Sequence, residues 1–379
     1  METEGWERAG LYDRDDAGAD ERLALLSYLT ERGASVEQMV EAHRLGGLPA
    51  LAGDLVVGSN GAPPSVDEVA ARLGVPAERV DRILLSVGLP AADDNELPDL
   101  DALMGAFEQA VAVLGEDAIL AFTRVLGSAA ATIAEAAVAL FYAEVGPGTA
   151  GEGSTELERA QVSEMAMLAF TAVPDVLSNI LLAQFKRTTR RAGLTRGWAP
   201  PTGKEGGGAP TGPSEIVALG FVDLVGSTAW AADLSLREHS LALSRFESAA
   251  WSSAILAGGR VVKMIGDEVF FTAPSVDAAS RIGTEICRMA SLDPLLPPAR
   301  GAVGYGLVTP REGDYFGPLV NLVSRLVKGA PPGAIVVTAE AAEALSGGSW
   351  ALEELEPLTV RGLGQPVRAF VISADAALP

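Results

Sequence analysis

Cysteine is nearly absent from this chain of 379 residues, which contains only Cys287. A single cysteine can neither close an internal disulfide nor build a metal site from several cysteines. Long apolar runs are also absent, because no stretch without Asp, Glu, Lys or Arg exceeds 12 residues. A membrane-spanning helix needs about 20 apolar residues, and the acidic start, Met1 to Glu4, is unlike a signal peptide. We therefore expect a soluble, cytoplasmic protein without membrane insertion.

Positive charge is scarce in the first half of the chain. The whole sequence has a formal net charge of −22, and residues 1–185 alone carry 31 acidic against 10 basic side chains. Nucleic acids and anionic lipid surfaces bind clusters of Lys and Arg, so neither is an expected partner. Lysine is rarest of the charged residues, with 4 against 24 arginines. A lysine inside a motif therefore suggests a specific functional role for its side chain.

A segment rich in glycine and proline divides the chain. Residues 198–213 are mostly Gly, Pro, Ala and Thr, and they follow a basic segment that ends at Arg196. Such a composition cannot bury an apolar face and is typical of a linker. We predict a domain over residues 1–190, a linker over 191–213 and a second domain over 214–379.

The first domain is predicted to be all helical. Apolar residues recur every three or four positions in windows rich in Ala, Leu and Glu. These windows are residues 21–32, 35–45, 99–114, 116–145 and 155–191.

Residues 65–84 resemble a helix-turn-helix. Ser65 and Glu68 can form a capping box, Gly74 can make the turn, and Pro76 can begin the second helix. A DNA-binding unit needs a basic recognition helix, whereas the second helix balances two arginines against two acidic residues. The pattern therefore favours a packing unit over a DNA-binding one.

The second domain alternates strands and helices. The predicted strands are residues 216–222, 260–265, 269–272, 302–308, 334–338, 353–360 and 367–373. The predicted helices are residues 235–258, 276–290 and 318–328, with a short helix after residue 338. This order predicts an α+β, ferredoxin-like domain, with helices packed on a mostly antiparallel sheet.

Two aspartates stand at strand ends. Asp223 ends an apolar strand and precedes Gly226, Ser227 and Thr228, where backbone N–H groups at a helix start can bind phosphate. Asp267 lies in a tight turn between two apolar strands. Carboxylates at adjacent strand ends can hold one or two Mg²⁺ ions, whose other ligands are water and phosphate oxygens. A polar pair, Asn321 and Arg325, is spaced four residues apart and so shares one helical face.

Three ordered motifs in residues 214–375 resemble the catalytic domain of class III adenylate cyclases. They are Phe-Val-Asp-Leu-Val-Gly-Ser-Thr from residue 221, Lys-Met-Ile-Gly-Asp-Glu-Val from residue 263, and Gly-Asp-Tyr-Phe-Gly-Pro-Leu-Val-Asn-Leu-Val-Ser-Arg from residue 313. Residues 1–190 more loosely resemble the helical regulatory domain of bacterial members. The resemblance implies an enzyme that converts ATP to 3′,5′-cyclic AMP and pyrophosphate, under control of an autoinhibitory helical domain.

The resemblance also assigns individual residues. Asp223 and Asp267 match the ligands of two metal ions, Mg²⁺ or Mn²⁺, and Lys263 and Asp314 match the pair that recognises adenine. In the family each site lies between the two chains of a head-to-tail homodimer, with the metal ligands and the purine-binding residues on different chains.

Three further assignments concern the ribose and the phosphates. Asn321 matches the residue that orients the ribose, Arg325 the residue that stabilises the pentavalent phosphorus, and Arg361 a basic residue near the terminal phosphates. The family often has Lys at this last position.

Two alternatives remain open. A diguanylate or guanylate cyclase would share the chemistry, but the diguanylate signature has two glycines before its acidic pair, and residues 265–270 read Ile-Gly-Asp-Glu-Val-Phe. A catalytically silent nucleotide-sensing regulator would be expected to have lost a metal aspartate or the transition-state arginine, and both are present.

Overall fold

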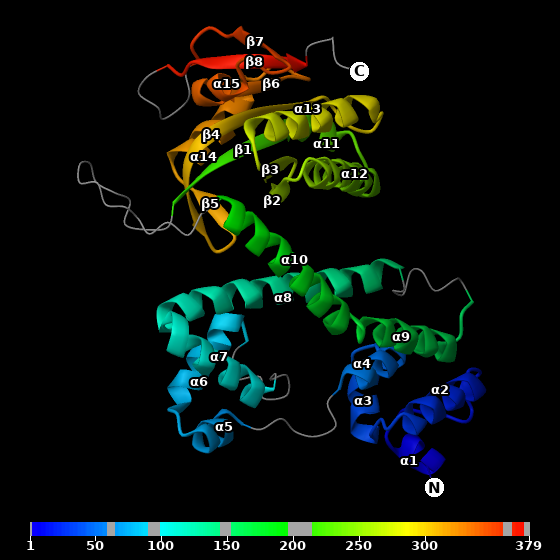
Figure 1. Cartoon of the computed structure of the whole chain (residues 1–379). Helices are drawn as coiled ribbons and strands as arrows, with labels where there is room; N and C mark the ends of the chain where they lie inside the picture. Colours follow the sequence, from blue (N-terminus) through cyan, green and yellow to red (C-terminus); the bar gives the residue numbers. More distant parts are fainter. Residues whose placement is uncertain are drawn as a thin grey trace. The chain divides into compact units, whose positions relative to one another are not determined.

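The computed structural model describes residues 2–58, 65–89, 99–144, 153–195, 214–358 and 366–374 (Figure 1). The chain divides into two compact units, Met1–Glu205 and Gly206–Pro379. Of the linker predicted over residues 191–213, residues 191–195 instead continue the last helix of the first unit, and residues 196–213 lie outside the described part of the chain.

The first unit is all helical where it is described. Its helices are α1 (Glu2–Arg8), α2 (Ala19–Glu31), α3 (Val36–Arg44), η1 (Leu48–Ala50), α4 (Leu51–Val57), α5 (Val66–Leu73), α6 (Ala77–Val87), α7 (Leu100–Leu114), α8 (Glu116–Glu144), α9 (Glu156–Phe170) and α10 (Val173–Thr195). The structure adds α1 and α4 to the prediction, and it divides the helix predicted over 155–191 into α9 and α10 at a turn over residues 171–172. Two apolar clusters form its core, one beneath α1–α4 and α9, the other among α5–α8.

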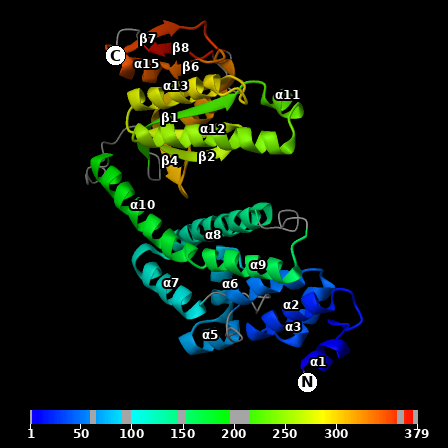
Figure 2. The same ribbon diagram turned by 90° about the vertical axis from the view of Figure 1, so that its right-hand side faces the viewer.

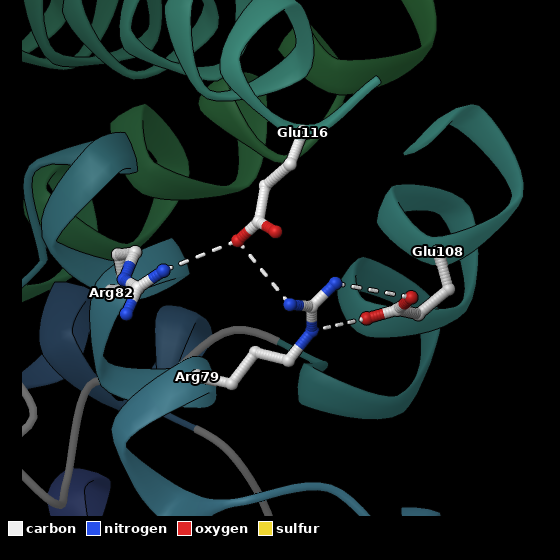
Figure 3. Close-up of polar contacts among 4 residues, drawn as sticks. All are labelled: Arg79, Arg82, Glu108 and Glu116. Atoms are coloured by element: carbon white, nitrogen blue, oxygen red, sulfur yellow. Dashed lines mark hydrogen bonds and ion pairs between the residues drawn. The ribbon is translucent and has the colours of Figure 1, made fainter. Parts of the chain in front are cut away.

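The helix-turn-helix segment is confirmed as two helices, α5 and α6, joined by a short turn. Ser65 and Glu68 form the capping box, and Gly74 ends α5 with a left-handed φ of 68°. Its two second-helix arginines are engaged within the unit, as Figure 3 shows. The Nε atom of Arg79 lies 2.7 Å from Glu108. Arg79 and Arg82 each lie 3.2 Å from Glu116. These contacts join α6 to α7 and α8, which agrees with a packing role.

Two helical stretches are long and apolar enough to cross a membrane by length and composition alone. They are Glu116–Phe141 and Glu156–Arg190, and little of either is buried. The expected absence of membrane insertion therefore stays a prediction.

The second unit is built on one mixed sheet. Its strands are β1 (Glu215–Leu224), β2 (Arg260–Ile265), β3 (Glu268–Ala273), β4 (Ala299–Arg311), β5 (Asp314–Phe316), β6 (Ile335–Thr338), β7 (Trp350–Glu354) and β8 (Ala369–Ala374). The strand order is β2-β3-β1-β4-β6-β8-β7, with β5 paired to β4, and only β4–β6 is parallel among the described strands. The first four strands, with the longer helices α12 (Leu236–Leu256) and α13 (Val276–Leu292) between them, follow the βαββαβ path of a ferredoxin-like fold, which confirms the predicted class.

Helices cover both faces of this sheet. The helices of the second unit are α11 (Ser227–Ala232), α12 (Leu236–Leu256), α13 (Val276–Leu292), α14 (Pro318–Leu326), η2 (Val327–Gly329) and α15 (Ala339–Leu345). Figure 2 shows α12 and α13 side by side on one face, where Phe246, Ile282 and Phe271 are buried. On the other face, α14 and η2 cover Phe221, Phe270 and Val336. Strand β7 begins three residues before the strand predicted over 353–360 and ends six residues before the end of that prediction, and β5 was not predicted.

Candidate active site

Three carboxylates gather at the end of β1. Asp223 is directly opposite Glu268 of β3 on one side and Arg300 of β4 on the other. Asp267 lies in the turn between β2 and β3, and its carbonyl accepts a hydrogen bond from Leu224, 3.3 Å from the amide nitrogen. The antiparallel register therefore brings together the two predicted metal-binding aspartates and adds a third acid.

Burial and repulsion from neighbouring carboxylates destabilise the ionised forms of Asp223 and Glu268. Burial raises the pKa of Asp223, and Asp267 raises it further, while Arg300 opposes the shift. Burial, with a smaller contribution from Asp223, raises the pKa of Glu268 to about 7, although Lys328 lowers it. Carboxylates with raised pKa values mark a place where an added cation would be stabilised.

Arg300 is the principal protein cation of this cluster. Its Nη2 atom lies 3.5 Å from Oδ2 of Asp223, and its Nη1 atom donates to the carbonyl of Lys328 at 3.2 Å. Its Nε atom is buried without a hydrogen-bond partner. Sequence reasoning missed Arg300 and Glu268, because only the strand register places them beside Asp223. The rarity of lysine could have pointed to Lys328.

The donor set at this end of the sheet suits a hard divalent cation. Asp223 and Asp267 offer carboxylate oxygens, the ligand type that Mg²⁺ prefers. Within the described ranges, no three His, Cys, Asp or Glu side chains, these carboxylates included, are grouped so that they could hold a metal ion by themselves. Ions held here would therefore need further oxygen ligands from the main chain, water or a substrate. The adjacent turn places Gly226 at the N-cap of α11 with a φ of 71°.

Lys263 and Asp314 form a second polar cluster. The Lys263 ammonium is paired with Oδ2 of Asp314, and it lies 6.0 Å from the centre of the Phe270 ring. Oδ1 of Asp314 accepts a hydrogen bond from the amide of Tyr315 at 2.7 Å. The Lys263 side chain is 46% exposed, so the pair is accessible to a ligand. The structure thus brings together the two residues predicted to recognise adenine.

Asn321 and Arg325 share the exposed face of α14. Val323 and Leu326, on the opposite face, are buried against the sheet. The first turn of the helix is fixed by Pro318 directly after Gly317. Arg361 lies outside the described residues. The described unit therefore presents an acidic cluster, a Lys–Asp pair and an exposed Asn–Arg face.

Comparison with known proteins adds four findings. A family model described as the adenylate cyclase regulatory domain matches residues 7–188. An uncharacterised protein of Mycobacterium tuberculosis is 31% identical over 98% of this chain and 94% of its own length. An adenylate cyclase of Glutamicibacter nicotianae is 28% identical over 81% of this chain and 78% of its own. The crystal structure of the adenylyl cyclase CyaB from P. aeruginosa covers 42% of this chain and 95% of its own, with 19% identity and a TM-score of 0.38.

The raised pKa of Glu268 generates a prediction for the metal-free protein. Between its ordinary value of 4.5 and about 7, the folded state holds a proton that the unfolded state releases. Stability is therefore greatest below this range and falls as the pH rises through it. In EDTA, we expect the Tm of the wild type to fall between pH 5 and pH 8 more steeply than the Tm of Glu268→Gln. Glu247→Gln, at an exposed position on α12, is the control; equal slopes for all three proteins would contradict the assignment.

Proposed function

Because the chain belongs to the bacterial class III adenylate cyclases with an N-terminal regulatory domain, we propose that it converts ATP to 3′,5′-cyclic AMP and pyrophosphate by a two-metal mechanism. The observation that carries the proposal is the meeting of Asp223 and Asp267 at the end of β1, where the charge of Asp267 contributes to the raised pKa of Asp223. A diguanylate cyclase or a silent nucleotide sensor is less well supported, because the motif residues of an ATP cyclase are all present in the sequence.

The proposed reaction is an in-line displacement at the α-phosphorus of ATP. The 3′-oxygen of the ribose forms a bond to phosphorus, the bond to pyrophosphate breaks, and the 3′-hydroxyl proton is released. Two Mg²⁺ or Mn²⁺ ions held by Asp223 and Asp267 would lower the pKa of this hydroxyl and neutralise phosphate charge. Asn321 would orient the ribose, and Arg325 would stabilise the five-coordinate phosphorus, a contribution of about 3–4 kcal/mol.

The remaining proposed contacts bind the phosphates. The backbone N–H groups of Gly226, Ser227 and Thr228 begin a helix, where four such groups have no partner within the helix itself. Arg361 is proposed to bind the terminal phosphates. Arg300 is close enough to Asp223 to balance its charge before the metal ions arrive.

Specificity for ATP is supported by the donor chemistry of Lys263 and Asp314. An ammonium group can only donate, which suits N1 of adenine, and an ionised carboxylate can only accept, which suits the N6 amino group. Guanine reverses both polarities on this edge and would leave polar groups unpaired, at about 1–3 kcal/mol each. The paired side chains are already close together in the free chain.

A head-to-tail homodimer is the proposed active form. Asn321 and Arg325 lie on the face of α14 that is turned away from their own core. Side chains so arranged can meet a substrate that is held by another molecule. In a symmetric dimer, the metal ligands of one chain would face the purine, ribose and transition-state residues of the other.

The helical unit is proposed to inhibit the catalytic unit in the resting state, in the cytoplasm. Its own apolar clusters and ion pairs support an independently folded regulator. Such a regulator acts by biasing the meeting of two catalytic units rather than by adding a catalytic group.

Loss of either metal-binding carboxylate is expected to abolish the reaction. Asp223→Asn and Asp267→Asn should each lower cyclic AMP production from ATP by about 100-fold or more, because the ions supply several kcal/mol of transition-state stabilisation. Asp233→Asn, at an exposed position after α11, should retain activity. Activity is measured with Mg²⁺ and with Mn²⁺, and near-normal turnover by either site variant would reject the metal assignment.

Mixing two inactive proteins tests the shared site. Asp223→Asn and Arg325→Ala should each be inactive alone, since both sites of each homodimer lack one group. A heterodimer of the two would contain one complete site, so mixing is expected to restore up to about half of the activity per heterodimer. Persistent inactivity, with subunit exchange verified by tagged copies, would indicate a site within one chain.

Truncation tests resting inhibition. Residues 214–379 alone are expected to turn over ATP faster than the full chain, at protein concentrations where both are dimeric. The two should be compared across pH, because release from inhibition can itself depend on conditions. A truncated protein slower than the full chain at every pH would instead identify the helical unit as an activator.

A further inference from the structure

The β4–β5 hairpin holds Asp314 by a strained turn. Arg311 pairs with Asp314, so Glu312 and Gly313 form a two-residue connection, and their φ angles are 53° and 81°. Two successive positive φ angles define a type I′ turn, which favours Asn-Gly or Asp-Gly. A glutamate at the first position is unfavourable, and such strain persists where the surroundings fix the conformation. Asp314 is the first residue after this turn.

Arg260 provides a contact that fixes the conformation of this turn. Its Nη2 atom donates to the carbonyl of Gly313 at 2.9 Å, and its guanidinium carbon lies 5.4 Å from the centre of the Tyr315 ring. The two contacts lie on either side of Asp314. Arg260 begins β2, the same strand that carries Lys263 three residues later. One strand therefore supplies both the partner of the Asp314 side chain and the support of its backbone.

An aromatic stack lies below these groups. The Tyr315 ring meets Phe270 edge-on at 6.5 Å, and Phe270 is stacked on Phe221 at 4.4 Å. Phe270 and Phe221 are buried, so they form a rigid base beneath Lys263 and Tyr315.

The support matters because β2 and β5 are not neighbours in the sheet. Among the described strands, β2 pairs with β3 and β5 pairs with β4. The hairpin is therefore held against β2 by side chains, namely the Lys263–Asp314 ion pair and Arg260. A purine that binds Lys263 and Asp314 must break the ion pair between them and form its own hydrogen bonds to both side chains. The contact from Arg260 to Gly313 uses neither group and can persist while the purine is bound.

We propose that Arg260 is a positioning residue that holds Asp314 at the distance from Lys263 that adenine requires, and so helps to determine purine specificity. This inference rests on the proposed role of Lys263 and Asp314 in adenine recognition. The adenine ring does not react, so its contacts contribute equally to the bound substrate and the transition state. Their loss raises KM while kcat changes little.

Steady-state kinetics of the full-length protein with ATP and with GTP test the proposal. Arg260→Met keeps the aliphatic stem and removes the donors, and it is expected to raise the KM for ATP about tenfold, with kcat within about twofold, since the lost hydrogen bond is charge-assisted. The preference for ATP over GTP should narrow. Arg260→Lys, which keeps one donor, should recover part of the loss, and Arg288→Met, which removes an exposed arginine from α13, should change neither constant.

A double variant separates positioning from general stability. If Arg260 acts through Asp314, then Arg260→Met adds nothing to Asp314→Asn, whereas independent effects would multiply. If the losses of the two single variants multiply in the double variant, the positioning role of Arg260 is rejected. The same holds if Arg260→Met keeps its KM and its ATP preference while Asp314→Asn is impaired. Both outcomes leave the adenine assignment of Asp314 intact. An unimpaired Asp314→Asn would reject the adenine assignment itself and the inference with it. Thermal melts accompany each variant, and if Arg260→Met does not fold, Arg260→Lys against Arg288→Lys decides by the same KM criterion.

Discussion

Electrostatic repulsion among three carboxylates at the end of β1 is the constraint on which the catalytic unit depends. Asp223, Asp267 and Glu268 are partly buried together, and burial removes the water that would screen their charges. Arg300 and Lys328 balance part of this charge from β4 and η2. A site with an excess of buried negative charge and few donors favours divalent cations and the phosphates that accompany them.

The antiparallel sheet converts distant sequence positions into one surface. Asp223 and Phe221 are two residues apart on β1 and therefore point to the same face of the sheet. Phe221 stacks on Phe270, and Lys263 lies above Phe270. The acidic carboxylates and the aromatic stack thus follow from the register of β1, β2 and β3, whereas Asp314 reaches Lys263 from the β4–β5 hairpin. A slip of one residue would turn Asp223 to the opposite face.

Much of this arrangement could be predicted from the sequence, and the rest depended on tertiary contacts. Apolar runs and capping boxes identified most elements, and ordered motifs identified Asp223 and Asp267. Glu268 and Arg300 could not be found in this way, because only pairing across the sheet brings them to Asp223. The turn that divides the helix predicted over 155–191 has no glycine, and the proline that follows it, Pro174, lies in the first turn of α10, where proline is tolerated. The apolar periodicity continues through this turn, so the sequence predicted one helix where the structure has two.

The exposed Asn–Arg face of α14 suggests how the proposed catalysis could be controlled. Val323 and Leu326 must face the sheet to stay buried, and the helical period then turns Asn321 and Arg325 outward. Residues directed outward can contribute to chemistry only where another surface completes the site. If that surface is a second catalytic unit, the rate depends on how two units meet, and a few kcal/mol in that equilibrium suffices to switch activity. A regulatory domain then needs no contact with ATP, because changing the population of the assembled pair changes the number of complete sites.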